Sequence, residues 1–104
     1  MATVVLMGTL DTKGQEYDYL RQRLREQGVD VLLVDVGVLG QPLARPDIAR
    51  EEVAATAGSD LAALAAAGDR GAAMEAMGRG AAEIVKRLYS EGRLDGVLAV
   101  GGSG

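Results

Sequence analysis

The sequence contains no cysteine and no histidine. Without cysteine the chain can form neither a disulfide nor a thiolate metal site, and such a composition is typical of reducing compartments, so we expect a cytoplasmic protein. Without histidine it lacks a Ser-His nucleophile, a histidine-ligated zinc and the commonest general base. Any chemistry must therefore use carboxylates, hydroxyls, amines and backbone groups.

Aromatic residues, basic stretches and long apolar runs are also scarce. Three tyrosines are the only aromatics and the net charge is −4, which argues against a nucleic-acid partner. No apolar run approaches the roughly 20 residues of a membrane span, and the first residues lack the pattern of a signal peptide. The apolar fraction is 48%, but much of it is alanine, which buries little area. We therefore expect a marginally stable domain that is assisted by a ligand, a second domain or a second subunit, and we expect a homo-oligomer.

Strand and helix patterns alternate along the chain. Short apolar runs predict strands at residues 3–7, 29–36 and 96–100, and capped or periodic segments predict helices at 12–27, 48–56, 61–67 and 69–90. Asp60 and Asp69 are the expected caps of the last two helices, and Gly68 ends the first of these. This order predicts an α/β fold, a three-layer Rossmann-like domain with a parallel sheet of strand order 2-1-3. A glycine-rich end after a strand should lead into a helix, so we expect residues 1–104 to be part of a larger nucleotide-binding domain whose continuation and second domain are absent.

The segment from Gly8 to Gly14 links the first strand to the first helix and has the layout of a phosphate-binding loop. A helix N-terminus stabilises an anion, and a lysine there would add a full charge. Thr12 and Gln15 fit a capping box. The glycine spacing matches neither the dinucleotide fingerprint nor a Walker A loop, and the alternative is a capped helix with its lysine in solvent. The candidate nucleotide-binding residues here are Gly8, Thr9, Asp11, Thr12, Lys13 and Gly14.

Two further places at the same sheet edge could contact a nucleotide. Asp35 ends the second strand, where it could bind ribose hydroxyls or bond nearby backbone N–H groups in a turn. Gly101, Gly102, Ser103 and Gly104 form a second glycine loop after the third strand. Asp11 could hold magnesium with the phosphates or act as an alternative N-cap; we favour the cap and assign no metal ligand.

The long helix contains Gly78 and Gly80, which each cost about 1 kcal/mol relative to alanine. Close packing must offset that cost. Either the helix packs tightly on the sheet, or Ala72, Ala76 and Gly80 form a smooth strip that contacts another subunit.

Five short motifs, in this order and spacing, resemble the N-terminal domain of the ATP-binding family named after the tomato tobamovirus-resistance protein, whose bacterial members were long grouped as an uncharacterised protein family. The resemblance covers essentially the whole chain. The motifs are Gly-Thr-Leu-Asp-Thr-Lys-Gly at 8–14, Val-Asp-Val-Gly at 34–37, Pro-Asp-Ile at 46–48 with Arg-Glu-Glu-Val at 50–53, Asp-Arg-Gly at 69–71 and Gly-Gly-Ser-Gly at 101–104.

The resemblance implies ATP binding, with residues 8–14 and 101–104 matching the two loops of the family's site. We therefore expect an ATP-binding module of a larger two-domain protein, with or without Mg²⁺. Two alternatives stay open. The domain could be half of the site of an ATP-dependent or phosphate-handling enzyme, or it could be a structural dimerisation domain built on the glycine-alanine strip.

Overall fold

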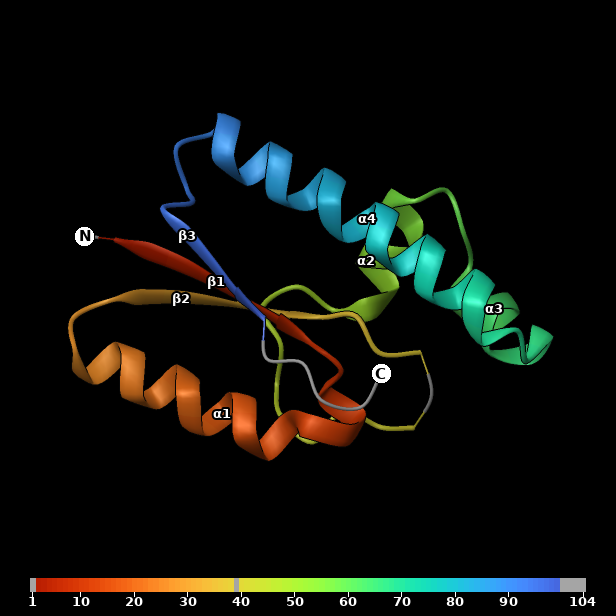
Figure 1. The fold of residues 1–104 in the computed structure, drawn as a ribbon, viewed down its shortest axis with the longest axis horizontal. Coiled ribbons are helices and arrows are strands. Elements are labelled where there is room, and N and C mark those ends of the chain that lie inside the picture. Colours follow the sequence, from red (N-terminus) through yellow and green to blue (C-terminus); the bar gives the residue numbers. More distant parts are fainter. Residues whose placement is uncertain (1, 39, 100–104) are drawn as a thin grey trace.

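The computed structural model describes residues 2–38 and 40–99 and shows a three-layer α/β arrangement, with helices on both faces of a small sheet (Figure 1). The strand, helix and strand that open the chain form one parallel unit, and three helices precede the last strand. The elements are β1 (Thr3–Gly8), α1 (Leu10–Glu26), β2 (Asp30–Asp35), α2 (Arg50–Thr56), α3 (Leu61–Ala67), α4 (Arg70–Ser90) and β3 (Gly96–Ala99).

All three strands are parallel, in the order β2-β1-β3, which confirms the predicted fold class and topology. β1 lies in the centre because its apolar side chains suit a strand covered on both faces. Leu6 pairs in register with Leu33 on one side and with Leu98 on the other. Because β2 and β3 lie on opposite sides of β1, the chain connections diverge at β1.

Two hydrophobic cores form on the two faces of the sheet, because neighbouring side chains of a strand point to opposite sides. Leu6 and Leu33 are fully buried beneath α1, where Tyr17 and the partly buried Leu20 and Leu24 complete the core. The other core joins the sheet to α2 and α4. Its buried members are Val5, Val34, Val53, Ala54, Met77, Ala81, Ile84 and Leu88.

Most helix ends follow the local sequence. The side chains of Asp60 and Asp69 accept backbone N–H bonds from Ala62 (3.4 Å) and Ala72 (3.1 Å), so both residues cap their helices as predicted. A left-handed Gly68 (φ 67°) follows α3, as expected of a glycine at a helix end. Within the described part of the chain, no helix combines the length and apolarity that crossing a membrane requires.

The start of α1 differs from the prediction. The helix begins at Leu10, with Thr9 as its N-cap residue, and no side chain caps it. The capping box of Thr12 and Gln15 and the alternative cap at Asp11 are therefore both wrong. Lys13 has non-helical backbone angles (φ −120°, ψ 18°), so a kink separates the first turn from the rest of the helix. The predicted helix start at Thr12 therefore lies next to this kink, and the true start is at Leu10.

The glycine-alanine strip of α4 also has a different partner from those predicted. A Cβ on Gly80 would collide with the backbone carbonyl of Val53, so this glycine allows α4 to pack closely against α2. Ala76 is only 5% exposed, whereas Ala72 is exposed. Because Gly80 packs against α2 and Ala76 is buried within the same chain, neither residue is available to another subunit. Nothing lies within 4 Å of a Cβ built on Gly78, so no described neighbour requires that glycine.

Candidate functional site

The connection between β1 and α1 is a single residue, Thr9, so the predicted loop is largely the first turn of the helix. The hydroxyls of Thr9 and Thr12 lie 2.8 Å apart, and the Thr12 hydroxyl also donates to the Thr9 carbonyl at 3.3 Å. Thr12 is exposed and Thr9 is half-buried. The carboxyl end of β1 thus presents a pair of hydroxyls at the surface.

The two glycines that bound this segment are explained by packing within the chain. Tyr17 lies against Gly8 so closely that a Cβ there would collide with the ring, and its hydroxyl donates to the Met7 carbonyl at 2.6 Å. A Cβ on Gly14 would lie 2.6 Å from the Cβ of Leu43. These glycines make room for Tyr17 and for the loop that carries Leu43, so their presence is not in itself evidence of a phosphate cradle.

Lys13 is partly solvent-exposed and has a nearby acidic partner. Its side chain is 37% exposed, and its ammonium lies 3.8 Å from a carboxylate oxygen of Glu16. An exposed pair at this distance contributes little to stability, so the lysine remains free to meet an anion. The structure places it on the same turn as the two threonine hydroxyls.

Asp35 occupies the carboxyl end of β2 and is almost wholly buried, at 1% exposure. Its Oδ1 accepts backbone N–H bonds from Leu10 (3.2 Å) and from Gly37 (2.9 Å). The bond from Gly37 confirms the turn interpretation, and the bond from Leu10 places a carboxylate at the N-terminus of α1. A helix N-terminus favours a negative group, and at the N–H of Leu10 that group is the carboxylate of Asp35 from the same chain.

The second oxygen of Asp35 faces Arg50, which belongs to the motif at 50–53 but was given no role from the sequence. Arg50 Nε lies 3.8 Å from Asp35 Oδ2, an ion pair too long for a hydrogen bond, so Oδ2 has no hydrogen-bond partner. Arg50 also donates from Nη2 to the Gly40 carbonyl. The available signal was positional: Arg50 shares one face of α2 with Val53 and Ala54, and a charged residue on a buried face needs a partner.

Desolvation raises the pKa of the Asp35 carboxyl above its ordinary value of 3.8, and this effect outweighs the backbone bonds and Arg50, which lower it. The nearby Asp11 also raises this pKa. Asp11 Oδ1 is buried and has no hydrogen-bond partner. Both carboxylates approach Gly37, since a Cβ built there would lie 2.7 Å from Asp11 Oδ1 and 3.1 Å from Asp35 Oδ1.

A pocket of about 540 Å³ opens beside Asp35. Arg50 and Asp35 lie at one part of its wall, and of the predicted nucleotide-binding residues only Asp35 lines it. The remaining lining residues come from the loop after β2 and from α2 and α3, namely Val38, Gln41, Pro42, Pro46, Ala49, Glu51, Asp60, Leu61, Ala62 and Ala65.

The predicted site residues thus fall into three groups. Thr9, Thr12 and Lys13 lie together on the first turn of α1, and Asp11 and Asp35 approach each other behind it. Gly101, Gly102, Ser103 and Gly104 lie outside the described residues. In the described part of the chain, no cluster of three acidic side chains is arranged to hold a metal ion.

Parallel strands, one helix layer on each face and polar residues at the carboxyl ends of β1 and β2 define a Rossmann-like α/β domain. More particularly, residues 2–104 match the family model described as the N-terminal domain of the uncharacterised protein family UPF0261. The chain belongs to this family, which confirms the bacterial grouping indicated by the motifs.

Curated relatives show how large the matched region is within whole proteins. A UPF0261 protein of Clostridium tetani is 43% identical over 101 residues, which cover 97% of this chain and 25% of the relative. UPF0261 proteins of Rhizobium meliloti and Brucella suis are 38% and 34% identical, and the matches cover 100% and 96% of this chain. The chain therefore spans about a quarter of the length of these relatives.

Proposed function

We propose that this domain binds the phosphate groups of a nucleotide, ATP in the first instance, at the carboxyl ends of β1 and β3. The observation that supports this location most directly is the strand order. The connections from β1 and β2 lead to opposite sides of β1, and open α/β sheets bind ligands at the carboxyl ends of the strands where this reversal occurs.

The residues at the end of β1 fit an anionic ligand. The hydroxyls of Thr9 and Thr12 can donate to phosphate oxygens, and the partly exposed ammonium of Lys13 supplies a positive charge on the same turn. Asp35 restricts the position of the ligand, because it already accepts the N–H of Leu10. The phosphates would therefore contact this turn from its exposed side, away from β2.

The buried carboxylates have supporting roles in this proposal. Asp35 fixes the first turn of α1 through Leu10, and Asp11 lies behind the same turn with an unsatisfied oxygen. A magnesium ion carried by the nucleotide could be reached from Asp11 through water, since carboxylates bind magnesium in this way at phosphate sites. The role of Gly101, Gly102, Ser103 and Gly104 as a second phosphate-binding loop belongs to the same proposal.

The identity of the nucleotide rests on the motif resemblance to the tobamovirus-resistance-like ATP-binding family. We propose a binding module that passes its bound state to another domain, in preference to half of an enzyme site. Among the described residues, the partly exposed Lys13 lies beside the hydroxyl pair, its nearby carboxylate Glu16 is exposed and paired with it, and the carboxylate oxygens Asp11 Oδ1 and Asp35 Oδ2 are buried behind the turn. This set suits binding of phosphates better than activation of a water molecule or a substrate.

The proposal is tested by thermal unfolding of the chain with and without millimolar ATP. A ligand that binds only the folded state raises the melting temperature. At 100 times its Kd, such a ligand adds about 2.7 kcal/mol to the free energy of unfolding. Lys13→Ala should remove most of this shift. Lys86→Ala is the matched control, because Lys86 also lies 3.8 Å from a glutamate three residues away, on the distant helix α4.

A melting temperature that does not change with ATP, at concentrations up to several millimolar, would reject the proposal. Equal loss of the shift in the Lys13 and Lys86 variants would move the binding site away from the first turn of α1. The magnesium question is answered by the same titration in the presence of a chelator.

A further inference from the structure

β3 has an exposed edge and two exposed faces, although its sequence is wholly apolar after Gly96. Val97 is 50% exposed and Leu98 is 39% exposed. Their positions in the register place Val97 on the face of Val5 and Leu98 on the face of Leu6. Because both Val5 and Leu6 are fully buried, the same two faces of the sheet are covered over β1 and open over β3.

The backbone of β3 is also incompletely paired. Its only described strand neighbour is β1, so its other edge offers N–H and C=O groups without a described strand partner. Open apolar edges of this kind invite pairing with another strand. A run of apolar residues exposed on both faces is typical of an internal parallel strand, whereas edge strands are commonly protected by charged residues or proline.

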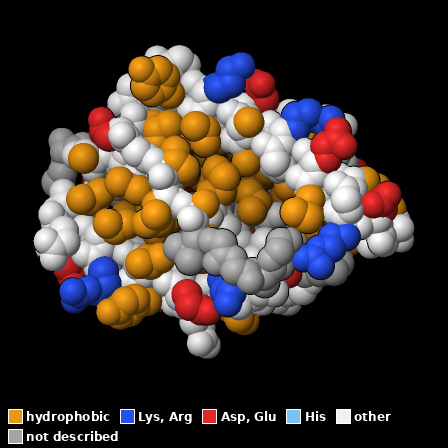
Figure 2. Space-filling view, viewed as in Figure 1, with side chains coloured by type: hydrophobic (Ala, Val, Ile, Leu, Met, Phe, Trp, Pro, Cys, Tyr) orange, Lys and Arg blue, Asp and Glu red, His pale blue; other side chains and the backbone are white. Residues whose placement is uncertain are grey.

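The surrounding surface has the same character. Figure 2 shows hydrophobic side chains gathered over a broad area of the face that carries β3, interrupted by few charges. The exposed Met74 belongs to α4, on the same side of the sheet as Val97. Contiguous apolar surfaces are uncommon on isolated monomers and mark sites of contact.

We propose that β3 is an internal strand of a larger sheet, and that the polypeptide following residue 104 in the whole protein covers it. That polypeptide adds a strand to the free edge and places apolar side chains over Val97 and Leu98. The length of the relatives supports this occupant. The matched model describes an N-terminal domain, and three quarters of each relative lies outside the match.

This assignment goes beyond the proposed nucleotide site and is independent of it. β3 would be completed by the rest of the protein whether or not ATP binds. β3 contrasts in this respect with the strip on α4, since Ala76 is already buried within the chain and Val97 is half exposed.

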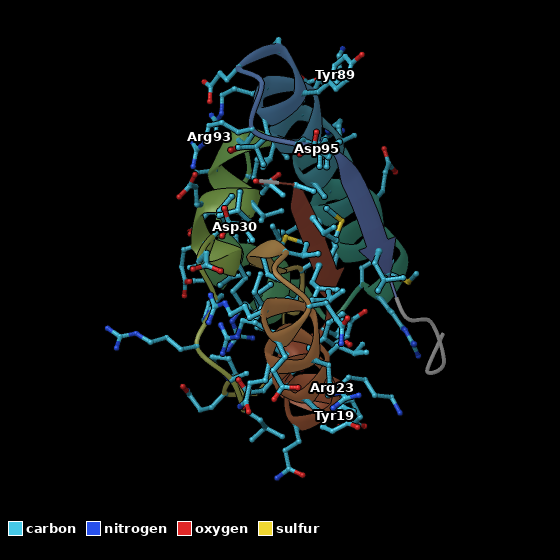
Figure 3. The ribbon with its side chains drawn as sticks, turned by 90° about the vertical axis from the view of Figure 1, so that its left-hand side faces the viewer. Tyr19, Arg23, Asp30, Tyr89, Arg93 and Asp95 are labelled. Carbon is cyan, nitrogen blue, oxygen red and sulfur yellow. The ribbon has the colours of Figure 1, made fainter. Side chains whose placement is uncertain are left out.

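Cysteine labelling can test this surface, because the chain has no cysteine of its own. Val97→Cys and Leu98→Cys are introduced separately into the chain of residues 1–104 and into the full-length encoded protein. The modification rate by a maleimide is then followed by mass spectrometry of the peptide that contains the new cysteine. Arg23→Cys is the control, because its side chain is 59% exposed on α1 (Figure 3).

We expect both β3 cysteines to react at a rate similar to the control in residues 1–104, and roughly tenfold or more slowly in the full-length protein. The control should react at similar rates in both. Equal rates at position 97 in the two proteins would overturn the proposal, as would an encoded protein that ends at residue 104.

A second copy of the chain would give a different result. The cysteine at position 97 would then be protected from the maleimide even in the chain of residues 1–104. This protection would increase with protein concentration, and sizing would give the mass of a dimer. That outcome would replace the following polypeptide with self-pairing. Unfolding curves of each variant identify any change that comes from a loss of folding.

Discussion

β2 and β3 flank the same central strand but lie in opposite environments. Leu33 and Leu98 pair with Leu6 from its two sides, yet Leu33 is fully buried and Leu98 is 39% exposed. Between its terminal aspartates β2 is as apolar as β3, so the difference at the two leucines does not come from the composition of the strands. It comes from the segments that the chain places beyond each strand.

The outer edge of β2 is closed by the loop that follows it. The N–H of Leu33 donates to Asp47 Oδ2 at 2.7 Å, and its carbonyl accepts N–H bonds from Asp47 (2.8 Å) and Ile48 (3.0 Å). Asp35 then donates its N–H to the Ile48 carbonyl at 3.0 Å. This extra pairing satisfies backbone groups that an edge strand would leave open, and no described segment does the same for β3.

The difference matters for the proposed nucleotide site, because that site lies at the carboxyl end of the central strand β1, with β2 on one side and β3 on the other. On the side of β2, Asp35, Arg50 and Gly40 hold the loop and the first turn of α1 in place. On the side of β3, the described residues provide no such network. In the proposed site, one half is therefore built into this domain, and the other half depends on the segment that we propose to cover β3.

Removing the charge that balances Asp35 should have the largest effect on this comparison. Arg50→Met leaves a buried carboxylate without its cationic neighbour, and breaking such a pair costs about 3 kcal/mol or more. We expect a loss of about that size in the free energy of unfolding at pH 7, measured by urea denaturation. The methionine retains apolar volume, so the loss reports on the charge and on the hydrogen bond that Arg50 donates to the Gly40 carbonyl.

The control for this variant removes both charges. Asp35→Asn combined with Arg50→Met should recover part of the loss, because no uncompensated charge stays buried and the asparagine oxygen can still accept the N–H bonds from Leu10 and Gly37. If Arg50→Met lowers the free energy of unfolding by less than about 0.5 kcal/mol, the guanidinium contributes no more to stability than an ordinary surface charge. The closed side of the sheet would then not depend on this pair.

Truncation of the two leucines that flank Leu6 compares the sides directly. Leu33→Ala should cost about 2 to 5 kcal/mol, the range for a buried leucine. Leu98→Ala in the same chain should cost less than about 1 kcal/mol, because water already reaches its side chain. The measurement is again urea denaturation, with the slope compared between variants to confirm that the unfolding transition is unchanged.

Similar losses for the two leucines would show that β3 is covered in residues 1–104 and would remove the contrast. Completion of the sheet predicts a further change in the full-length protein. There, Leu98→Ala should approach the cost of Leu33→Ala, because the following polypeptide would bury Leu98 as α1 buries Leu33.

The sequence predicted the larger features of this domain well. The strand order followed from three short apolar runs and their connections. Asp60 and Asp69 marked helix starts, because an aspartate before a helix can accept an unpaired N–H bond of the first turn. Gly68 marked a helix end for a similar local reason. These features depend on neighbours in sequence, which a single chain displays directly.

The details of the site could not be predicted in the same way, because they depend on residues far apart in sequence. Thr12 and Gln15 satisfy the spacing of a capping box, but Asp35 reaches the N–H of Leu10 and the helix starts a turn earlier. Gly8 has the position of a phosphate-loop glycine, while its structural reason is the ring of Tyr17. Only the assembled sheet brings these partners together.

The pH dependence of stability should show the smallest effect and should isolate Asp35 on the closed side. Desolvation raises the folded-state pKa of this carboxyl above its ordinary value of 3.8. Between the ordinary and the raised pKa, the folded state holds its proton while the unfolded state has released it. The contribution of Asp35 to the free energy of unfolding therefore falls as pH rises through that window, and it levels off above the folded-state pKa.

Asp35→Asn removes this titration. The free energy of unfolding of the parent chain, minus that of the variant, should therefore decrease as pH rises from 3.8. The amide of the asparagine would face Arg50 at every pH. This contact changes the stability difference by a constant amount and leaves its dependence on pH unchanged. Urea denaturation at several pH values above 3.8 measures the slope. A difference that instead grows in favour of the parent would mean that Arg50 and the two N–H donors outweigh burial. The Asp35 carboxylate would then be stabilised in its charged form by the closed edge of the sheet.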